Sequence, residues 1–176
     1  MKVLLLIVCL TSAIFCQAQK PKKHKKRDKQ EQAIPSPVST QTINNVSSDC
    51  DPALEKYVYN PARLTMIEKC VTVTGIIEES SANDDGDHHM LLRLDKGQEN
   101  LLTKINIKKK QGNLVIEAVC ANKTSLKKVG SICNGFINKV QIPKLVTHVK
   151  VTGSLVNDTH NGWNEIHPIT KIEILK

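Results

Sequence analysis

The sequence predicts an all-β domain: a five-stranded, OB-like barrel with long insertions and little helix. Three observations predict this class. Five short runs are rich in β-branched and apolar residues, glycines interrupt the first and fourth of these runs, and a long irregular segment separates the third from the fourth. An immunoglobulin-like sandwich is the alternative. It requires about seven strands, so five strands favour the barrel.

The elements are expected in the following order. Residues 51–57 begin a short helical turn, with Asp51 as its cap and Pro52 at the first helical position. A glycine at position 75 indicates a bulge or a tight bend in the first strand, and Pro168 in the last strand requires an edge position or a bulge. The strands themselves are expected at residues 70–78, 88–95, 114–120, 148–157 and 165–175.

Alternation assigns the faces of the second strand. Met90, Leu92 and Leu94 are expected to face the core, whereas the intervening residues, among them His89 and Leu91, are expected to face outward or toward a partner. Residues 96–113 contain scattered apolar positions and predict a short helix or an irregular arm. The sequence Val-Thr-Val-Thr-Gly at 71–75 is echoed by Val-Lys-Val-Thr-Gly at 149–153, which suggests two strands with equivalent roles in a barrel.

Residues 1–18 have the pattern of a secretory signal peptide. Lys2 precedes an apolar run of 13 residues that ends at Phe15, which is too short to span a bilayer, and a small-x-small cleavage site follows. Lipid attachment at Cys16 is disfavoured because Phe15 is bulky. Residues 19–48 predict a disordered Lys-rich tether, since they contain few apolar residues. The ordered domain is therefore expected at residues 49–176 of a secreted or periplasmic protein without a transmembrane segment.

Most of the net charge of +8 belongs to the tether. The segment from Lys20 to Lys29 holds seven basic residues and one acidic residue, whereas residues 49–176 hold 17 Lys and Arg against 15 Asp and Glu. Such a basic arm suits an anionic envelope surface, although a soluble spacer has the same composition. The domain itself has few aromatic residues outside its lead-in segment, so we do not expect nucleic-acid binding.

Four cysteines remain after removal of the signal peptide, and they predict disulfides. An even number of cysteines in an exported chain is typical of a disulfide framework, and four cysteines allow three pairings. We expect the local pairing, Cys50 with Cys70 and Cys120 with Cys133. A four-cysteine zinc site is disfavoured because no Cys-x-x-Cys pair is present.

A set of polar residues forms the candidate site. Glu165 and His167 lie two residues apart in a predicted strand, so their side chains share a face. If that strand neighbours the strand of His89, these three residues converge, and Asp85 or Asp87 can add an oxygen ligand. Two imidazoles and a carboxylate suit a divalent metal such as zinc.

Several motifs together resemble a set of small exported bacterial proteins of unknown function. The resemblance rests on the echoed strand at 71–75, on Asp-Gly-Asp-x-His at 85–89, on the later cysteine pair, and on Gly-Trp-x-Glu-Ile-His-Pro at 162–168. It covers approximately residues 50–174 and implies an OB-like domain with a site, but no reaction. Those proteins often have His just before the Gly-Trp pair; here His160 lies one residue earlier, and Trp163 is the Trp of the motif.

Three readings of the polar set stay open: a bound metal, a metal-free ligand site, and a hydrogen-bonded network that only orders one end of the barrel. We expect an exported, disulfide-stabilised binding module of unknown ligand rather than an enzyme. The alternative is a divalent-metal-dependent hydrolase, in which an open coordination position activates water.

Overall fold

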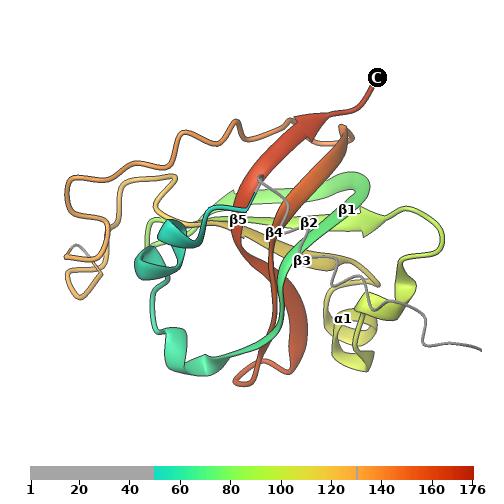
Figure 1. The fold of residues 1–176 in the computed structure, drawn as a ribbon, viewed down its shortest axis with the longest axis horizontal. Coiled ribbons are helices and arrows are strands. Elements are labelled where there is room, and N and C mark those ends of the chain that lie inside the picture. Colours follow the sequence, from blue (N-terminus) through green and yellow to red (C-terminus); the bar gives the residue numbers. More distant parts are fainter. Residues whose placement is uncertain (1–49, 130) are drawn as a thin grey trace, which may run out of the picture. The chain divides into compact units, whose positions relative to one another are not determined.

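A computed structural model describes residues 50–129 and 131–176 (Figure 1). The predicted signal peptide at 1–18 and the predicted tether at 19–48 lie outside the described residues. Five strands, three 3₁₀ helices and one short α-helix make up the described part. In chain order they are η1 (Pro52–Tyr57), η2 (Pro61–Arg63), β1 (Leu64–Ala82), β2 (His88–Leu94), η3 (Glu99–Leu101), α1 (Lys104–Lys109), β3 (Leu114–Ala118), β4 (His148–Asp158) and β5 (Trp163–Ile174).

The five strands form one closed sheet in the order β1-β2-β3-β5-β4, with β4 returning to β1. All neighbouring strands are antiparallel except β3 and β5, which run parallel. The sequence-based expectation of five strands and little helix is therefore confirmed. Strand β1 is longer than expected, because it begins at Leu64 rather than at residue 70 and pairs with β4 from its first residue.

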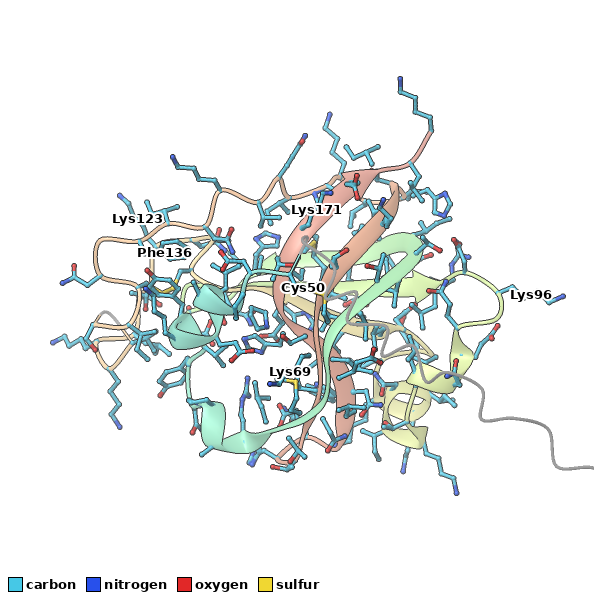
Figure 2. All side chains as sticks on the ribbon, in the orientation of Figure 1. Cys50, Lys69, Lys96, Lys123, Phe136 and Lys171 are labelled. Carbon is cyan, nitrogen blue, oxygen red and sulfur yellow. A yellow bond between two sulfur atoms is a disulfide. The ribbon has the colours of Figure 1, made fainter. Side chains whose placement is uncertain are left out.

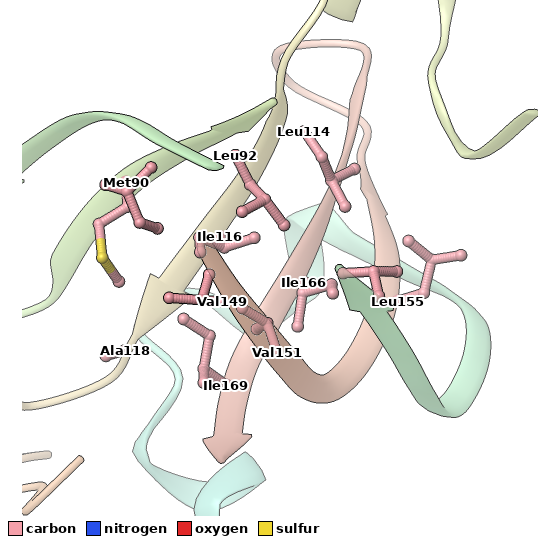
Figure 3. Packing of buried hydrophobic residues seen from close by; sticks show 12 residues of the cluster. Met90, Leu92, Leu114, Ile116, Ala118, Val149, Val151, Leu155, Ile166 and Ile169 are labelled. Atoms are coloured by element: carbon pink, nitrogen blue, oxygen red, sulfur yellow. The ribbon is translucent and has the colours of Figure 1, made fainter. Parts of the chain in front are cut away.

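Alternate residues of the strands fill the interior of the closed sheet (Figure 3). Met90 and Leu92 are fully buried there, as expected, and Leu94 packs against the same cluster. Leu91 points to the other face but is only 2% exposed, so the outer face of the sheet is also covered at this position. Each fully buried aliphatic side chain contributes roughly 1.5–3 kcal/mol to stability. The buried cluster comprises Val73, Ile77, Met90, Leu92, Leu114, Ile116, Ala118, Val149, Val151, Leu155, Ile166 and Ile169.

The two echoed segments are paired with each other. Val71 lies opposite Gly153 and Gly75 lies opposite Val149 in the antiparallel β1–β4 ladder. A Cβ atom on Gly75 would collide with the carbonyl oxygen of Arg93, which explains the glycine by a close backbone approach. The predicted β1 bulge lies two residues beyond Gly75, between Ile77 and Glu79.

A bulge in β5 decides which of its residues face outward. The β4–β5 register shifts on both sides of Gly153, so that Gly153 lies opposite Ile169. Ile166 and Ile169 consequently both face the interior although they are three residues apart, and His167 and Pro168 both lie outside. A Cβ atom on Gly153 would collide with the carbonyl oxygen of Pro168. Of the two positions expected for Pro168, an edge or a bulge, the structure shows the bulge.

The lead-in segment before β1 packs against the end of β3. Asp51 caps η1 through a 2.9 Å hydrogen bond from the Ala53 amide, as expected. A second apolar cluster joins Leu54 and Val58 to Val119. Tyr57 stacks on Phe136, which is labelled in Figure 2, with ring centroids 3.8 Å apart. The lead-in segment thus covers part of the outer face of the sheet.

Both expected disulfides are present, Cys50–Cys70 and Cys120–Cys133. The first joins the lead-in segment to β1, and the second closes the segment that follows β3. Among the described residues, no helix has both the length and the apolar character needed to cross a membrane.

Candidate metal centre

A buried cluster of one histidine and three carboxylates lies on the outer face of the sheet. Asp87 immediately precedes β2, Glu117 belongs to β3, and Glu165 and His167 belong to β5. The parallel β3–β5 register places Val115 beside Glu165 and Ile116 beside Ile166, so Glu117 comes next to His167. Three separate elements therefore bring these four side chains together, which we call the His167 cluster.

The imidazole of His167 is the centre of this cluster. Its Nδ1 atom lies 3.1 Å from Glu165 Oε1 and 3.4 Å from Glu117 Oε2, and its Nε2 atom lies 3.5 Å from Asp87 Oδ2. The four residues are between 0% and 5% exposed. Charged groups are rarely buried to this degree unless they are paired or bind a metal.

Two polar atoms of the cluster face each other without a hydrogen bond. Asp87 Oδ1 accepts a 2.8 Å hydrogen bond from the Cys120 amide, but Asp87 Oδ2 has no hydrogen-bond partner among the described residues. His167 Nε2 likewise has no hydrogen-bond partner among the described residues. The 3.5 Å between these two atoms is an ion-pair distance, longer than a good hydrogen bond. Buried polar atoms without a hydrogen bond need another partner, which here is either each other, as an ion pair, or an ion bound between them.

Glu165 is held in place from the other side. Its Oε2 atom accepts a 2.7 Å hydrogen bond from Trp163 Nε1, and the Nζ atom of Lys110 lies 4.1 Å from the centroid of the Trp163 ring. The only tryptophan of the chain therefore orients the Glu165 carboxylate and leaves Oε1 free to contact His167. This arrangement confirms that Glu165 and His167 share one face of their strand.

Burial and mutual charge shift the pKa values of the cluster. Burial alone lowers the pKa of His167, but the neighbouring carboxylates of Asp87, Glu165 and Glu117 outweigh this effect and raise it to about 10. Burial raises the pKa of Glu117 to about 7; the charge of His167 opposes this rise, and the nearby carboxylates add to it. The carboxylates therefore favour the protonated imidazole of His167, and burial favours the uncharged form of Glu117.

The structure places the predicted site residues differently from the expected set. Strand β3 lies between β2 and β5, so the strand of His89 does not neighbour the strand of Glu165 and His167, which was the condition for the expected convergence. His89 instead lies opposite Glu117 in the β2–β3 ladder. Burial, followed by the charge of Lys110, lowers the pKa of His89 to about 4.

The remaining predicted residues have supporting positions. Asp85 accepts a 3.1 Å hydrogen bond from the Asp87 amide and so shapes the turn before β2. Burial, and next the charge of Asp87, raise the pKa of the Asp85 carboxyl group. His160 is exposed in the turn between β4 and β5, and its amide donates to Asp158 Oδ1 at 2.9 Å.

The sequence-based prediction missed Glu117. This residue is the only charged side chain in the apolar run from Leu114 to Cys120, and it lies on the outward-facing side of its strand. A single charged residue in an otherwise apolar run could have identified Glu117 as a site residue, because a charge buried in such a run requires a partner.

Among the described residues, Asp87, Glu117 and His167 form the group whose donor atoms could hold one metal ion, with one donor atom of each within 4.8 Å of the others. A pocket of about 150 Å³ reaches His167 from the side of the lead-in segment. Its walls are mostly apolar: Val58, Pro61, Leu64, Met66, Val156 and Pro168, with Glu55 beside them.

Fold and site together define a small, disulfide-linked, closed-sheet domain with a buried histidine–carboxylate cluster. Comparison with protein-family models, curated proteins and solved structures found no match to the chain.

Proposed function

We propose that this chain is an exported, OB-like, non-catalytic binding module that holds a divalent transition-metal ion through Asp87, Glu117 and His167. The observation that supports this proposal most directly is a pair of buried atoms without a hydrogen bond. Asp87 Oδ2 and His167 Nε2 lie 3.5 Å apart and face each other inside a cluster of carboxylates. An ion between them would satisfy both atoms and would neutralise the excess of buried carboxylates.

The donor types select the class of metal. One imidazole nitrogen and two carboxylate oxygens suit Zn²⁺ or Mn²⁺, whereas the absence of a thiolate from the set of Asp87, Glu117 and His167 disfavours Cu(I). Glu165 bonds to His167 Nδ1 and therefore orients the imidazole ring, as carboxylates beside metal-bound histidines commonly do.

The OB-like assignment is supported by the strand order β1-β2-β3-β5-β4 and by the parallel β3–β5 pair. In OB folds, ligands bind on the face of strands 2 and 3, and the cluster is built on the outer side of these strands together with β5. A shared fold does not establish a shared function. The proposal therefore rests on the cluster.

A binding role is favoured over hydrolysis by the burial of the cluster. A metal-dependent hydrolase must admit its substrate to an open coordination position. Here Asp87, Glu117 and His167 are 5% exposed or less, and the adjoining pocket of about 150 Å³ is smaller than the ~300–1,000 Å³ of typical ligand pockets.

Export is proposed from the two disulfides, which persist in oxidising compartments, together with the predicted signal peptide. The basic arm from Lys20 to Lys29, proposed to bind anionic envelope surfaces, lies outside the described residues. The resemblance to small exported bacterial proteins also stays a prediction.

Titration calorimetry with Zn²⁺ and Mn²⁺ tests the proposed site on the oxidised protein. We expect one ion per chain, and we expect Glu117→Gln to weaken binding at least tenfold because it removes a ligand oxygen charge. Glu173→Gln is the matched control: Glu173 is in a half-exposed ion pair with Lys150 and is not a member of the His167 cluster, so its substitution should leave binding unchanged.

The same variants separate a metal centre from a network that only stabilises the fold. Burial disfavours the charged form of Glu117, so Glu117→Gln should not destabilise the metal-free protein above pH 7. A protein that binds neither ion, or that binds both equally well in the two variants, would reject the metal centre.

A further inference from the structure

The segment that follows β3 holds Asp87 in the His167 cluster. The Cys120 amide donates to Asp87 Oδ1 at 2.8 Å, and Asn122 Nδ2 donates to the Asp87 carbonyl oxygen at 3.1 Å. The Asn122 amide also donates to the carbonyl oxygen of Gly86 at 2.8 Å. Residues 120–122 therefore clamp the turn before β2, and they fix both the backbone and the carboxylate of Asp87.

Cys120 adopts a backbone conformation that must be held by its surroundings. Its φ angle is 51°, in the left-handed region that residues other than glycine seldom adopt. Two contacts hold it there: the disulfide to Cys133, and a 3.0 Å hydrogen bond from the Asn138 amide to the Cys120 carbonyl oxygen. The direction of the Cys120 N–H bond, and hence the hydrogen bond to Asp87, depends on this conformation.

We infer that the Cys120–Cys133 disulfide positions Asp87 for metal binding, so that reduction of this disulfide lowers the affinity of the site for its metal. The inference rests on the proposed metal centre. It adds that metal retention by the chain depends on the redox state of one disulfide.

The reduction is a thiol–disulfide exchange. A dithiol reductant gives two electrons and two protons, its own sulfurs join in a disulfide, and the sulfur–sulfur bond between Cys120 and Cys133 breaks to give two thiols. The backbone N–H of Cys120 is retained throughout. What changes is its placement, because the covalent restraint on its left-handed conformation is lost.

The second disulfide supplies a matched control. Cys50–Cys70 joins residues 20 apart in sequence and Cys120–Cys133 joins residues 13 apart, so both close loops of comparable size. Among the described residues, no hydrogen bond links Cys50 or Cys70 to the His167 cluster. Loss of either disulfide therefore lowers stability, whereas loss of Cys120–Cys133 alone lowers metal affinity.

The test measures the affinity for Mn²⁺ by electron paramagnetic resonance in the full protein and in two double variants. The serine substitutions leave no unpaired thiol in either variant, so the result does not depend on new cysteine ligands. We expect Cys120→Ser/Cys133→Ser to bind Mn²⁺ at least tenfold more weakly, and Cys50→Ser/Cys70→Ser to stay within twofold of the wild type.

Asn122→Ala, with both disulfides intact, covers the case in which the first double variant does not fold. This variant removes one hydrogen bond of the same clamp and should lower the affinity several-fold. If every variant that folds binds Mn²⁺ with the affinity of the wild type, the role of the disulfide is refuted, whereas the proposed metal centre is not. A wild-type protein that does not bind Mn²⁺ would overturn both.

Discussion

The pH dependence of stability is the most specific consequence of the His167 cluster. The carboxylates around His167 raise its pKa from an ordinary value of 6.5 to about 10 in the folded protein. The folded state therefore binds a proton that the unfolded state releases between these two values. We expect the metal-free protein to lose stability as the pH rises through this window.

The sign and the magnitude follow from proton linkage. The contribution of His167 is fully present below pH 6.5 and is lost by about pH 10, at a slope of at most ~1.4 kcal/mol per pH unit for one proton. The raised pKa of Glu117 has the same sign, but its effect falls between its ordinary value of 4.5 and about 7. Between pH 7 and pH 9 the unfolding free energy should thus fall by roughly 2–3 kcal/mol, mainly through His167.

Urea denaturation at pH 7, 8 and 9, in the presence of a chelator, measures this loss. His167→Gln should remove most of the slope, since the glutamine amide does not titrate. His148→Gln is the matched control: that imidazole is exposed and paired with Asp95, and its substitution should leave the slope in place.

A second variant protects the test against a misfolded His167→Gln protein. Asp87→Asn removes one of the carboxylates that raise the folded-state pKa of His167, so the loss of stability should still begin near pH 6.5 but should end at a lower pH and be smaller in total than in the wild type. A wild-type stability that stays constant from pH 7 to pH 9 would refute the reasoning, as would a slope that persists unchanged in His167→Gln.

Two other predictions concern the metal and the bulge. Metal binding must displace the proton of His167, so the affinity for Mn²⁺ should rise by roughly tenfold per pH unit between pH 7 and pH 8.5, and an affinity independent of pH would exclude His167 as a ligand. Gly153→Ala should destabilise the domain by roughly 1–3 kcal/mol in urea denaturation, because the added Cβ atom meets the Pro168 carbonyl oxygen and the Ile166 side chain. A Gly153→Ala protein as stable as the wild type would show that the backbone of Gly153 does not pack closely against Pro168 at the bulge.

The sequence was sufficient for the number and order of the strands and for the faces of residues 165–167, but not for the start of β1 at Leu64. Alternation predicted that Glu165 and His167 share one face of the strand and that Ile166 lies on the other face. Strand β5 has this arrangement. The local disulfide pairing was also predicted correctly, and the bulge at Pro168 was one of the two alternatives expected there. These are local properties, set by residues that are close in sequence.

The membership of the site was not predictable in the same way, because it depends on which strands are neighbours. Strand β3 lies between β2 and β5, so Glu117 takes the place that the sequence assigned to His89. The parallel β3–β5 pair joins segments that are far apart in sequence, and no local pattern specifies such a pair. The unexpected charge at Glu117 was a signal of burial, but it did not identify the partner.

The central claim is that Asp87, Glu117 and His167 bind a divalent metal ion. Its most direct test is an anomalous difference map from a crystal of the oxidised protein soaked with Zn²⁺, measured on both sides of the zinc absorption edge. We predict one peak among these three side chains, with Zn–N and Zn–O distances of about 2.0–2.2 Å. A map with no peak in the cluster, at a zinc concentration that occupies surface sites, would contradict the claim and leave His167 as an imidazolium paired only with carboxylates.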